Sequence, residues 1–366
     1  IKKKNYKVII SGGGTGGHIY PALSIAKGIQ KKIPKVKLLF VGAIGKMEMD
    51  KVPKAGYSII GLWISGFNRL KIYQNFLLPI KILVSVVHSF FILKRFVPNA
   101  VIGTGGFASG PLLYVASIIG IPILIQEQNS YPGITNRFLS KKADSICVAY
   151  SGLDIYFPKD KIKLTGNPIR QDLFEIALKE VKGKAYFKQN KEFKTLLILG
   201  GSLGAKRINK LIEEKLDYFQ ENNIQLIWQC GDLYYDQYKK YESRDRVYIA
   251  PYIKRMDFAY AAADFIISRA GASAISELCI VGKPVVFIPS PNVSEDHQTI
   301  NALKIAEQDA ALIITEPKLK SDFEYQFSNL LNSKNLQEKL KKNIKKLSNP
   351  LATEKIVNEV ITLLKA

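Results

Sequence analysis

The stretch Lys7–Leu23, KVIISGGGTGGHIYPAL, decides the fold because it passes from a β-branched run through a glycine-rich loop into a helical pattern. Lys7–Ile10 predicts a buried strand, and Tyr20–Lys32 predicts a helix with Pro21 near its first turn. Short strands alternate with helices in this way along the first 130 residues. This alternation indicates a parallel sheet covered by helices on both faces.

The glycine-rich loop satisfies G-x-G-x-x-G through Gly12, Gly14 and Gly17. Such a loop lets a phosphate or sugar approach the backbone at the positive end of a helix dipole. A dinucleotide site also needs an acid at the end of the second strand, where residues 40–43 read FVGA and no carboxylate occurs before Glu48. The pattern therefore favours a nucleotide or sugar ligand over a nicotinamide dinucleotide.

The length of 366 residues indicates two domains, and the net charge of +22 indicates a strongly basic surface. Residues 1–165 hold 23 basic and 6 acidic side chains, so this part carries +17 of the total. A basic half suits nucleic acid, an anionic membrane surface or a phosphorylated ligand. Because lysines dominate and lie beside apolar runs, no nucleic-acid partner is expected. The lead before Gly12 is too short for a signal-peptide core, so a cytoplasmic location is expected.

The second half repeats the pattern of the first. Residues 100–125 and 264–288 share the order strand, small-residue loop, helix, Gly-x-Pro, strand. Thr195–Leu199 is another apolar strand, and GGSLGA follows it. Two doubly wound α/β domains joined near 166–168 are therefore expected. A Lys-rich helical stretch at 324–345 and a last helix at 352–364 complete the pattern.

Two further loops, at 200–204 and 269–273, precede helices in the second half and together describe an anion cradle. Gly-Lys-Ser/Thr is absent, which excludes a P-loop, and Asp-x-Asp is absent, so no acidic pair is available to hold a metal on a diphosphate. Three scattered cysteines and three histidines do not suggest a metal centre either. No metal and no cofactor are expected.

Two single residues stand out by position. Glu277 lies six residues after Gly271, where its carboxylate could bind the hydroxyls of a ribose or simply face solvent. His18 follows the first loop directly, and histidine titrates near neutral pH, which suits a general base. A structural role for His18 stays open on spacing alone.

Seven motifs in order closely resemble the family of undecaprenyldiphospho-muramoylpentapeptide β-N-acetylglucosaminyltransferases, from about residue 7 to residue 314. They are GGGTGGHIYPALSIAKGI (12–29), GTGGFASGP (103–111), EQNSYPGITNR (127–137), GNPIR (166–170), LGGSLGA (199–205), SRAGASAISEL (268–278) and DHQTINA (296–302). The resemblance implies a GT-B fold with two Rossmann-like domains facing a central cleft. Residues 1–165 would form the acceptor and membrane-facing domain, 166–350 the UDP-sugar domain, and the helix at 351–366 would pack back on the first domain.

The resemblance also implies an inverting transfer of N-acetylglucosamine from UDP-N-acetylglucosamine to lipid I, which gives lipid II in peptidoglycan synthesis. His18 and Glu127 are the implied catalytic residues, with the choice of base open. Ser202 and Arg170 would serve the diphosphate, Glu277 the ribose, Ile253 the uracil through its backbone, and Gln298 and Asn129 the sugar. The other implied donor contacts are Thr15, Gly16, Gly17 and Ala272. Phe107 stands where the family often has tyrosine, so no hydroxyl role is expected there.

Alternatives from the same architecture are a transferase acting on a diacylglycerol-type lipid and a sugar-nucleotide epimerase. An acceptor with a polyprenyl chain requires contact with a bilayer, and the apolar stretch Phe76–Leu93 is the candidate. Its uncharged part, 82–93, is too short to span hydrocarbon, which takes roughly 20 residues. Arg69, Lys71, Lys81, Lys94 and Arg95 surround it. A helix lying on an anionic cytoplasmic leaflet is expected, and a core helix is the alternative.

Overall fold

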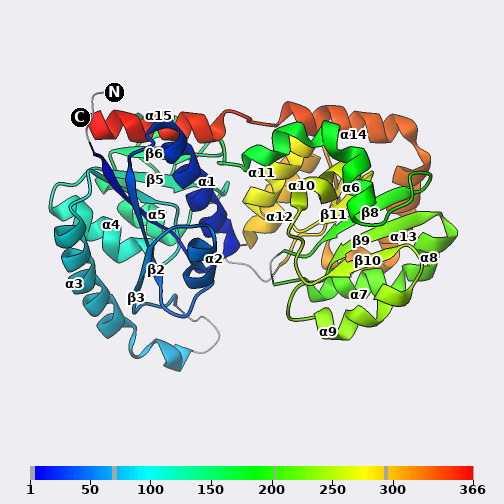
Figure 1. The fold of residues 1–366 in the computed structure, drawn as a ribbon, viewed down its shortest axis with the longest axis horizontal. Helices are drawn as coiled ribbons and strands as arrows, with labels where there is room; N and C mark the ends of the chain where they lie inside the picture. The colour runs from blue at the N-terminus through cyan, green and yellow to red at the C-terminus, as the bar shows by residue number, and fades with distance from the viewer. Residues whose placement is uncertain (1–4, 68–71, 202, 292–295, 366) are drawn as a thin grey trace. The chain divides into compact units, whose positions relative to one another are not determined.

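The computed structural model describes residues 5–67, 72–201, 203–291 and 296–365. The chain divides into two compact units (Figure 1): Ile1–Ile169 with Leu351–Ala366, and Arg170–Pro350. The division falls four residues beyond the boundary at residue 165 that the sequence suggests. Thr353 Oγ1 lies within hydrogen-bond distance of the Ile169 N–H (3.2 Å) and carbonyl oxygen (3.3 Å), so Ile169 is held by the last helix.

Unit 1 contains a parallel sheet with the strand order β3-β2-β1-β4-β5-β6-β7. Its strands are β1 Lys7–Ser11, β2 Lys37–Ala43, β3 Ile59–Leu62, β4 Ala100–Gly103, β5 Ile123–Glu127, β6 Ser145–Val148 and β7 Ile162–Leu164. Its α-helices are α1 Gly16–Lys32, α2 Glu48–Lys54, α3 Leu78–Phe96, α4 Ser109–Ile118, α5 Ile134–Leu139 and α15 Ala352–Lys365. Short 3₁₀ turns are η1 Ile72–Asn75, η2 Ser140–Lys142 and η3 Lys159–Lys161.

Alternating side chains of β1 enter two separate cores. Val8 and Ile10 join the core beneath α1 and α15, whereas Ile9 joins the core beneath α3 and α4. Helix α15 approaches α1 closely at Gly28, where a Cβ would lie 2.8 Å from Val357. Both faces of the sheet are thus covered, as an apolar β1 requires.

Unit 2 contains a second parallel sheet with the order β10-β9-β8-β11-β12-β13. Its strands are β8 Lys194–Leu199, β9 Ile224–Gln229, β10 Val247–Ala250, β11 Phe265–Ser268, β12 Val285–Phe287 and β13 Leu312–Ile313. Its α-helices are α6 Glu180–Tyr186, α7 Lys206–Glu214, α8 Leu216–Glu221, α9 Tyr235–Tyr238, α10 Met256–Ala262, α11 Ala272–Val281, α12 His297–Ala306, α13 Leu319–Asn332 and α14 Lys334–Lys346. The 3₁₀ segments are η4 Gln171–Lys179, η5 Lys239–Ser243 and η7 Glu316–Lys318.

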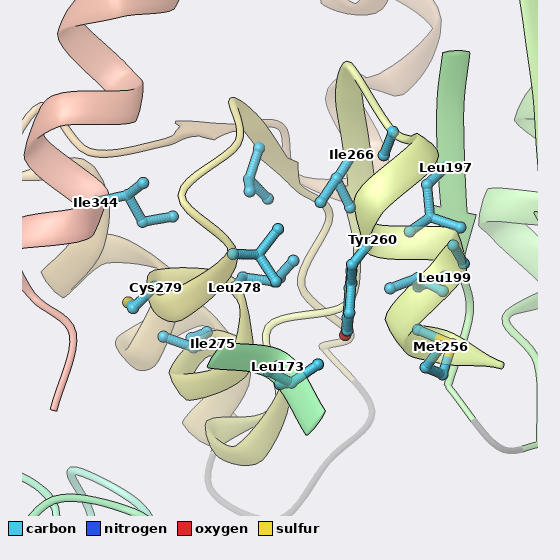
Figure 2. Close-up of a cluster of buried hydrophobic side chains, with 14 of the residues drawn as sticks. Leu173, Leu197, Leu199, Met256, Tyr260, Ile266, Ile275, Leu278, Cys279 and Ile344 are labelled. Atoms are coloured by element: carbon cyan, nitrogen blue, oxygen red, sulfur yellow. The ribbon is translucent and has the colours of Figure 1, made fainter. Parts of the chain in front are cut away.

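The core of unit 2 fixes helices α10 and α11 against β8. Figure 2 shows Ile275 and Leu278 of α11 and Tyr260 of α10 in one apolar cluster with Leu197 and Leu199 of β8. Because these side chains are buried, the amino ends of α10 and α11 have fixed positions beside the carboxyl ends of the strands.

The C-terminal region of unit 2 differs from the single helical stretch predicted at 324–345. Two helices, α13 and α14, meet at Ser333, whose backbone is extended. The Ser333 hydroxyl accepts the N–H of Leu336 at 3.2 Å and so caps α14. Within the described residues, no helix combines the length and hydrophobicity that crossing a membrane requires.

Candidate active site

Helix α1 begins earlier than the sequence pattern predicts, and this brings three predicted donor contacts into its first turn. The predicted start was Tyr20, but the N–H groups of both His18 and Ile19 donate to the Thr15 carbonyl at 3.2 Å. Thr15 is therefore the N-cap, and Gly16 and Gly17 are the first helical residues. Pro21 lies inside the helix rather than near its start.

His18 is held at three points near the end of β1. Its Nδ1 lies 3.1 Å from the Gly13 carbonyl oxygen and 3.2 Å from Thr15 Oγ1. Its main-chain carbonyl accepts the Thr104 hydroxyl at 2.8 Å. The half-buried ring therefore has a defined orientation, as a general base needs.

Two glycine loops of unit 1 approach each other backbone to backbone. A Cβ at Gly106 would lie 2.3 Å from the Gly13 carbonyl oxygen, and one at Gly12 would lie 1.8 Å from Thr104 Oγ1. Gly106 also has φ of +84°. Only glycine fits these positions. These glycines therefore allow the loop after β1 to pack directly against the loop after β4.

Phe107, the departure from the family motif, contacts the first loop. A Cβ at Gly14 would lie 3.0 Å from Phe107 Cε1. The ring is half-buried and packs against the core beneath α3 and α4. Phe107 thus supports the shape of the loop without a hydroxyl group.

Glu48 is a residue of this region that the sequence analysis missed. Its buried carboxylate accepts the N–H of Gly14 and the N–H of Ala43, both at 2.9 Å. One amide of the first glycine loop is therefore bound to an internal carboxylate. No sequence pattern assigns Glu48 a role, because it follows the end of β2 by five residues and only the folded loop brings it back to Gly14.

Glu127, at the end of β5, organises the loop that follows it. Its carboxylate accepts the main-chain N–H of Asn129 (2.9 Å) and of Gly133 (3.1 Å). It also accepts the side-chain amides of Asn129 (3.2 Å) and Asn136 (2.8 Å). With 1% of its surface exposed and four donors around it, this carboxylate is placed to hold Asn129 in position.

The His18 ring and an amide that donates to Glu127 both lie next to Gly105. A Cβ at Gly105 would lie 3.0 Å from His18 Cδ2 and 3.4 Å from the Asn136 Nδ2 that donates to Glu127. The structure thus brings His18 and the network of Glu127 to one place at the carboxyl ends of β1, β4 and β5.

In unit 2, the loop after β8 is connected to Ile253 through Gln229. Gln229 Nε2 donates to the Gly201 carbonyl at 3.0 Å, and Gln229 Oε1 accepts the Ile253 N–H at 3.2 Å. A uracil bound through that N–H would have to replace the bond to Gln229, a residue the sequence analysis missed. Ser202 lies outside the described residues.

Glu277 is positioned by a tyrosine of the neighbouring helix. Ala272 is the first residue of α11, and Glu277 lies half-buried further along it. The hydroxyl of Tyr260, on α10, donates to Glu277 Oε2 at 3.0 Å. Tyr260 is buried. The sequence analysis did not predict it, because Tyr260 and Glu277 are 17 residues apart in the chain and meet only when the two helices pack together.

An ion-pair network fixes the start of α10, which follows Ile253. The Arg255 guanidinium donates to both carboxylate oxygens of Asp257 at 2.9 Å, and Lys179 Nζ lies 3.3 Å from the same carboxylate. The bonds from Arg255 are the main cause that lowers the pKa of Asp257 to about 2. Asp257 is therefore ionised at neutral pH and holds the segment between β10 and α10.

The remaining predicted residues of unit 2 lie before η4 and at the start of α12. Arg170 precedes η4 and is half-buried. Gln298 lies in the first turn of α12, and its Oε1 accepts the Ser290 N–H at 3.0 Å. Arg269 is an arginine of a predicted cradle loop, but it pairs with Glu316 at 2.6 Å and so serves the packing of unit 2.

Two Rossmann-like parallel sheets with glycine-rich loops at their carboxyl edges define an α/β protein of the GT-B class. The chain belongs to glycosyltransferase family 28: the family's N-terminal domain matches residues 8–148 and its C-terminal domain matches residues 195–356. This membership confirms the predicted fold class and the predicted hexosyltransferase class.

Full-length relatives agree with this assignment. The chain is 56% identical over 99% of each chain to a Flavobacterium psychrophilum protein named UDP-N-acetylglucosamine–N-acetylmuramyl-(pentapeptide) pyrophosphoryl-undecaprenol N-acetylglucosamine transferase. It is 54% identical, again over 99% of each chain, to a protein of the same name from Christiangramia forsetii. The crystal structure of Acinetobacter baumannii MurG is similar with a TM-score of 0.75 and 26% identity, covering 98% of this chain and 100% of that one. The family resemblance seen in the sequence is therefore confirmed.

We expect Glu127→Gln to destabilise unit 1. The amide keeps the shape of the side chain but turns an NH₂ group toward N–H donors, which leaves at least one buried group unsatisfied at a cost of about 1–3 kcal/mol. Urea unfolding at neutral pH measures the loss. Glu354→Gln is the matched control, because that carboxylate is exposed and pairs only at the surface with Lys32, worth about 0–1 kcal/mol. Equal stability of Glu127→Gln and wild type would contradict an organising role.

Proposed function

We propose that this chain transfers N-acetylglucosamine from UDP-N-acetylglucosamine to the 4-hydroxyl of the muramoyl residue of lipid I, forming lipid II by an inverting single displacement. The observation that carries the proposal is the 56% identity over the full chain to a transferase named for these substrates. The oriented His18 and the fixed Glu277 agree with it.

In this reaction His18 takes the proton of the 4-hydroxyl while the oxygen attacks C1 of the donor sugar, and the C1–O bond to UDP breaks with its electron pair. General-base help of this kind contributes roughly 10²–10⁴-fold. Glu127 acts by holding Asn129 toward the donor sugar rather than as the base, since four donors already bind its carboxylate.

The donor's diphosphate needs compensation for its developing charge. Among the described residues, no three His, Cys, Asp or Glu side chains gather as a metal site would require. We assign the compensation to the N-terminus of α11, which begins at Ala272, and to Arg170 and Ser202. Glu277, fixed by Tyr260, binds the ribose hydroxyls, Ile253 meets the uracil, and Gln298 meets the sugar.

The transfer assay tests this function directly. Purified protein should move radiolabel from UDP-N-acetylglucosamine to lipid I, in EDTA as well as with Mg²⁺, because helix N-termini and cationic side chains neutralise the leaving group. Diacylglycerol as acceptor should receive no label, and donor incubated without acceptor should not epimerise. Label on diacylglycerol, epimerised donor, or activity that EDTA abolishes and Mg²⁺ restores would each refute a part of the proposal.

We expect Glu277→Ala to weaken UDP binding by about 1.5–3 kcal/mol, the value of a hydrogen bond to a charged group, with a much smaller loss for 2′,3′-dideoxy-UDP. Tyr260→Phe should weaken binding of UDP by a smaller amount, and again more than binding of the dideoxy analogue, because it removes the bond that positions the Glu277 carboxylate but keeps the carboxylate itself. Isothermal titration calorimetry measures all of these, and Glu307→Ala is the control because Glu307 is an exposed helix-terminal glutamate. Equal losses for both ligands would refute the contact to ribose.

Helix α3 supports the membrane part of the proposal. Its inward side buries Ser85, Ser89, Ile92 and Leu93. Its outward side is apolar with every member at least 39% exposed, namely Ile80, Ile82, Leu83, Val84, Val87, Phe90 and Phe91. A core helix would bury these side chains, so their exposure supports docking over the core alternative.

Cations surround the exposed face of α3. Lys94 and Arg95 are exposed at its end, and Lys94 Nζ lies 5.7 Å from the centre of the Phe90 ring. Lys81 lies near its start, whereas Arg69 and Lys71 are outside the described residues. An apolar face with cations at its edge suits an anionic bilayer, to which each nearby cation adds about 1 kcal/mol. We therefore propose that α3 docks on the cytoplasmic leaflet that holds lipid I.

Two variants separate the apolar and the ionic contributions to docking. Leu83→Ser/Phe91→Ser should weaken binding to vesicles at every salt concentration, whereas Lys94→Glu/Arg95→Glu should weaken binding to anionic vesicles mainly at low salt. Vesicle co-sedimentation measures both, and UDP affinity should stay unchanged. Leu178→Ser/Tyr325→Ser is the control, because these exposed apolar residues of unit 2 lie outside α3. Binding that ignores lipid charge and survives the α3 changes would refute docking through this helix.

A further inference from the structure

A single peptide group lies between a buried carboxylate and the candidate base. The N–H of Gly14 donates to Glu48 Oε2 at 2.9 Å. The carbonyl oxygen of Gly13, at the other end of the same peptide group, lies 3.1 Å from His18 Nδ1. Peptide resonance couples the N–H and the C=O, so a charge bound at one end polarises the other.

The position of Glu48 is fixed by its surroundings. Its side chain is fully buried, and its second oxygen accepts the Ala43 N–H at 2.9 Å. A Cβ at Gly13 would lie 2.1 Å from Glu48 Oε1, and one at Gly42 would lie 2.5 Å from Glu48 Cγ. Both glycines therefore leave room for this carboxyl group. No ion pair joins Glu48 to another of the described residues. Burying a carboxylate in this way costs stability, which a purely structural side chain at this position would not require.

The hydrogen-bond partners decide the tautomer of His18. A carbonyl oxygen can only accept, so a hydrogen bond between Nδ1 and the Gly13 carbonyl requires the tautomer that carries its proton on Nδ1. The lone pair then resides on Nε2, the atom on the side of Gly105, where a Cβ would lie 3.2 Å away. The Thr15 hydroxyl, 3.2 Å from Nδ1, can accept from the same N–H.

We propose that Glu48 is a positioning residue for His18 and acts through the Gly13–Gly14 peptide group. The carboxylate makes the Gly13 carbonyl a stronger acceptor, which holds the reactive tautomer and stabilises the imidazolium formed when Nε2 takes the acceptor's proton. The arrangement does through a peptide group what a carboxylate in direct contact with histidine does in a catalytic triad. This inference rests on the proposed role of His18 as the base.

The other charges that reach this histidine have defined signs. Glu127 is bound to Asn136, whose amide lies next to Gly105 as the His18 ring does, and the N-terminus of α1 places positive charge at the ring. Both remain when Glu48 becomes neutral. Removing the Glu48 charge therefore destabilises the imidazolium relative to the neutral ring, and the acid limb of the pH–rate profile should move to lower pH.

Glu48→Gln is the test variant, and Asp50→Asn, an exposed carboxylate change on the same helix, is its control. We expect kcat to fall roughly 10- to 100-fold, less than or equal to the loss of the base itself, with the Kd for UDP unchanged. In a His18→Ala background, Glu48→Gln should lower kcat little further, because the histidine on which Glu48 acts through the Gly13–Gly14 peptide group is then absent. An unmoved acid limb, or a full additional loss without His18, would overturn the proposal.

A measurement on wild-type protein tests the tautomer that the proposal requires, independently of the transfer reaction. ¹⁵N NMR of labelled histidine reports the tautomer of each ring, and His18→Gln identifies the signal among the three histidines. We expect the Nδ1–H form for neutral His18. The Nε2–H form would overturn the proposal even if lipid II is made, whereas the Nδ1–H form without transfer would reject the proposed function and keep the geometry.

Discussion

The close approach of two backbone loops is the constraint on which the candidate site of unit 1 depends. Gly106 and Gly13 meet with no space for a side chain between them, at the carboxyl ends of β4 and β1. This contact fixes the Gly13 carbonyl, and that carbonyl fixes the His18 ring. Parallel pairing of β1 with β4 in turn sets the distance between the loops. The register of these two strands therefore determines where the Gly13 carbonyl and the His18 ring lie.

The carboxyl edge of the sheet is arranged differently in each of the two units. In unit 1, an internal carboxylate already binds an amide of the first glycine loop, which makes that loop a holder for His18 rather than a full phosphate cradle. In unit 2, α11 begins at Ala272 after an extended Gly271, and Arg269 is paired with Glu316. The charge compensation that we propose for a diphosphate is therefore assigned to unit 2, although most of the net positive charge of the chain lies in residues 1–165.

Sequence reasoning predicted both sheets, because buried parallel strands read as short apolar runs between helical segments. It also singled out His18, which follows its glycine loop directly, and Glu277, which lies six residues after Gly271. The roles of both residues stay predictions. Sequence reasoning missed Glu48, Gln229 and Tyr260, since each acts on a residue that is distant in sequence and close only after the strands pair. The start of α1 was placed late because Pro21 resembles a first-turn proline, whereas the turn at Thr15 is set by main-chain bonds that no side chain signals.

Features that oppose stability gather in unit 1. Buried carboxylates at Glu48 and Glu127 and the exposed apolar face of α3 each violate the pattern that a core and a surface normally follow. The carboxylates are compensated by six N–H donors near the carboxyl ends of the strands, and these hydrogen bonds order the neighbouring loops. The face of α3 has no such compensation within the described residues of its own unit. Under the proposed docking, a bilayer would supply it, because lipid removes from water the same apolar surface that the protein leaves exposed.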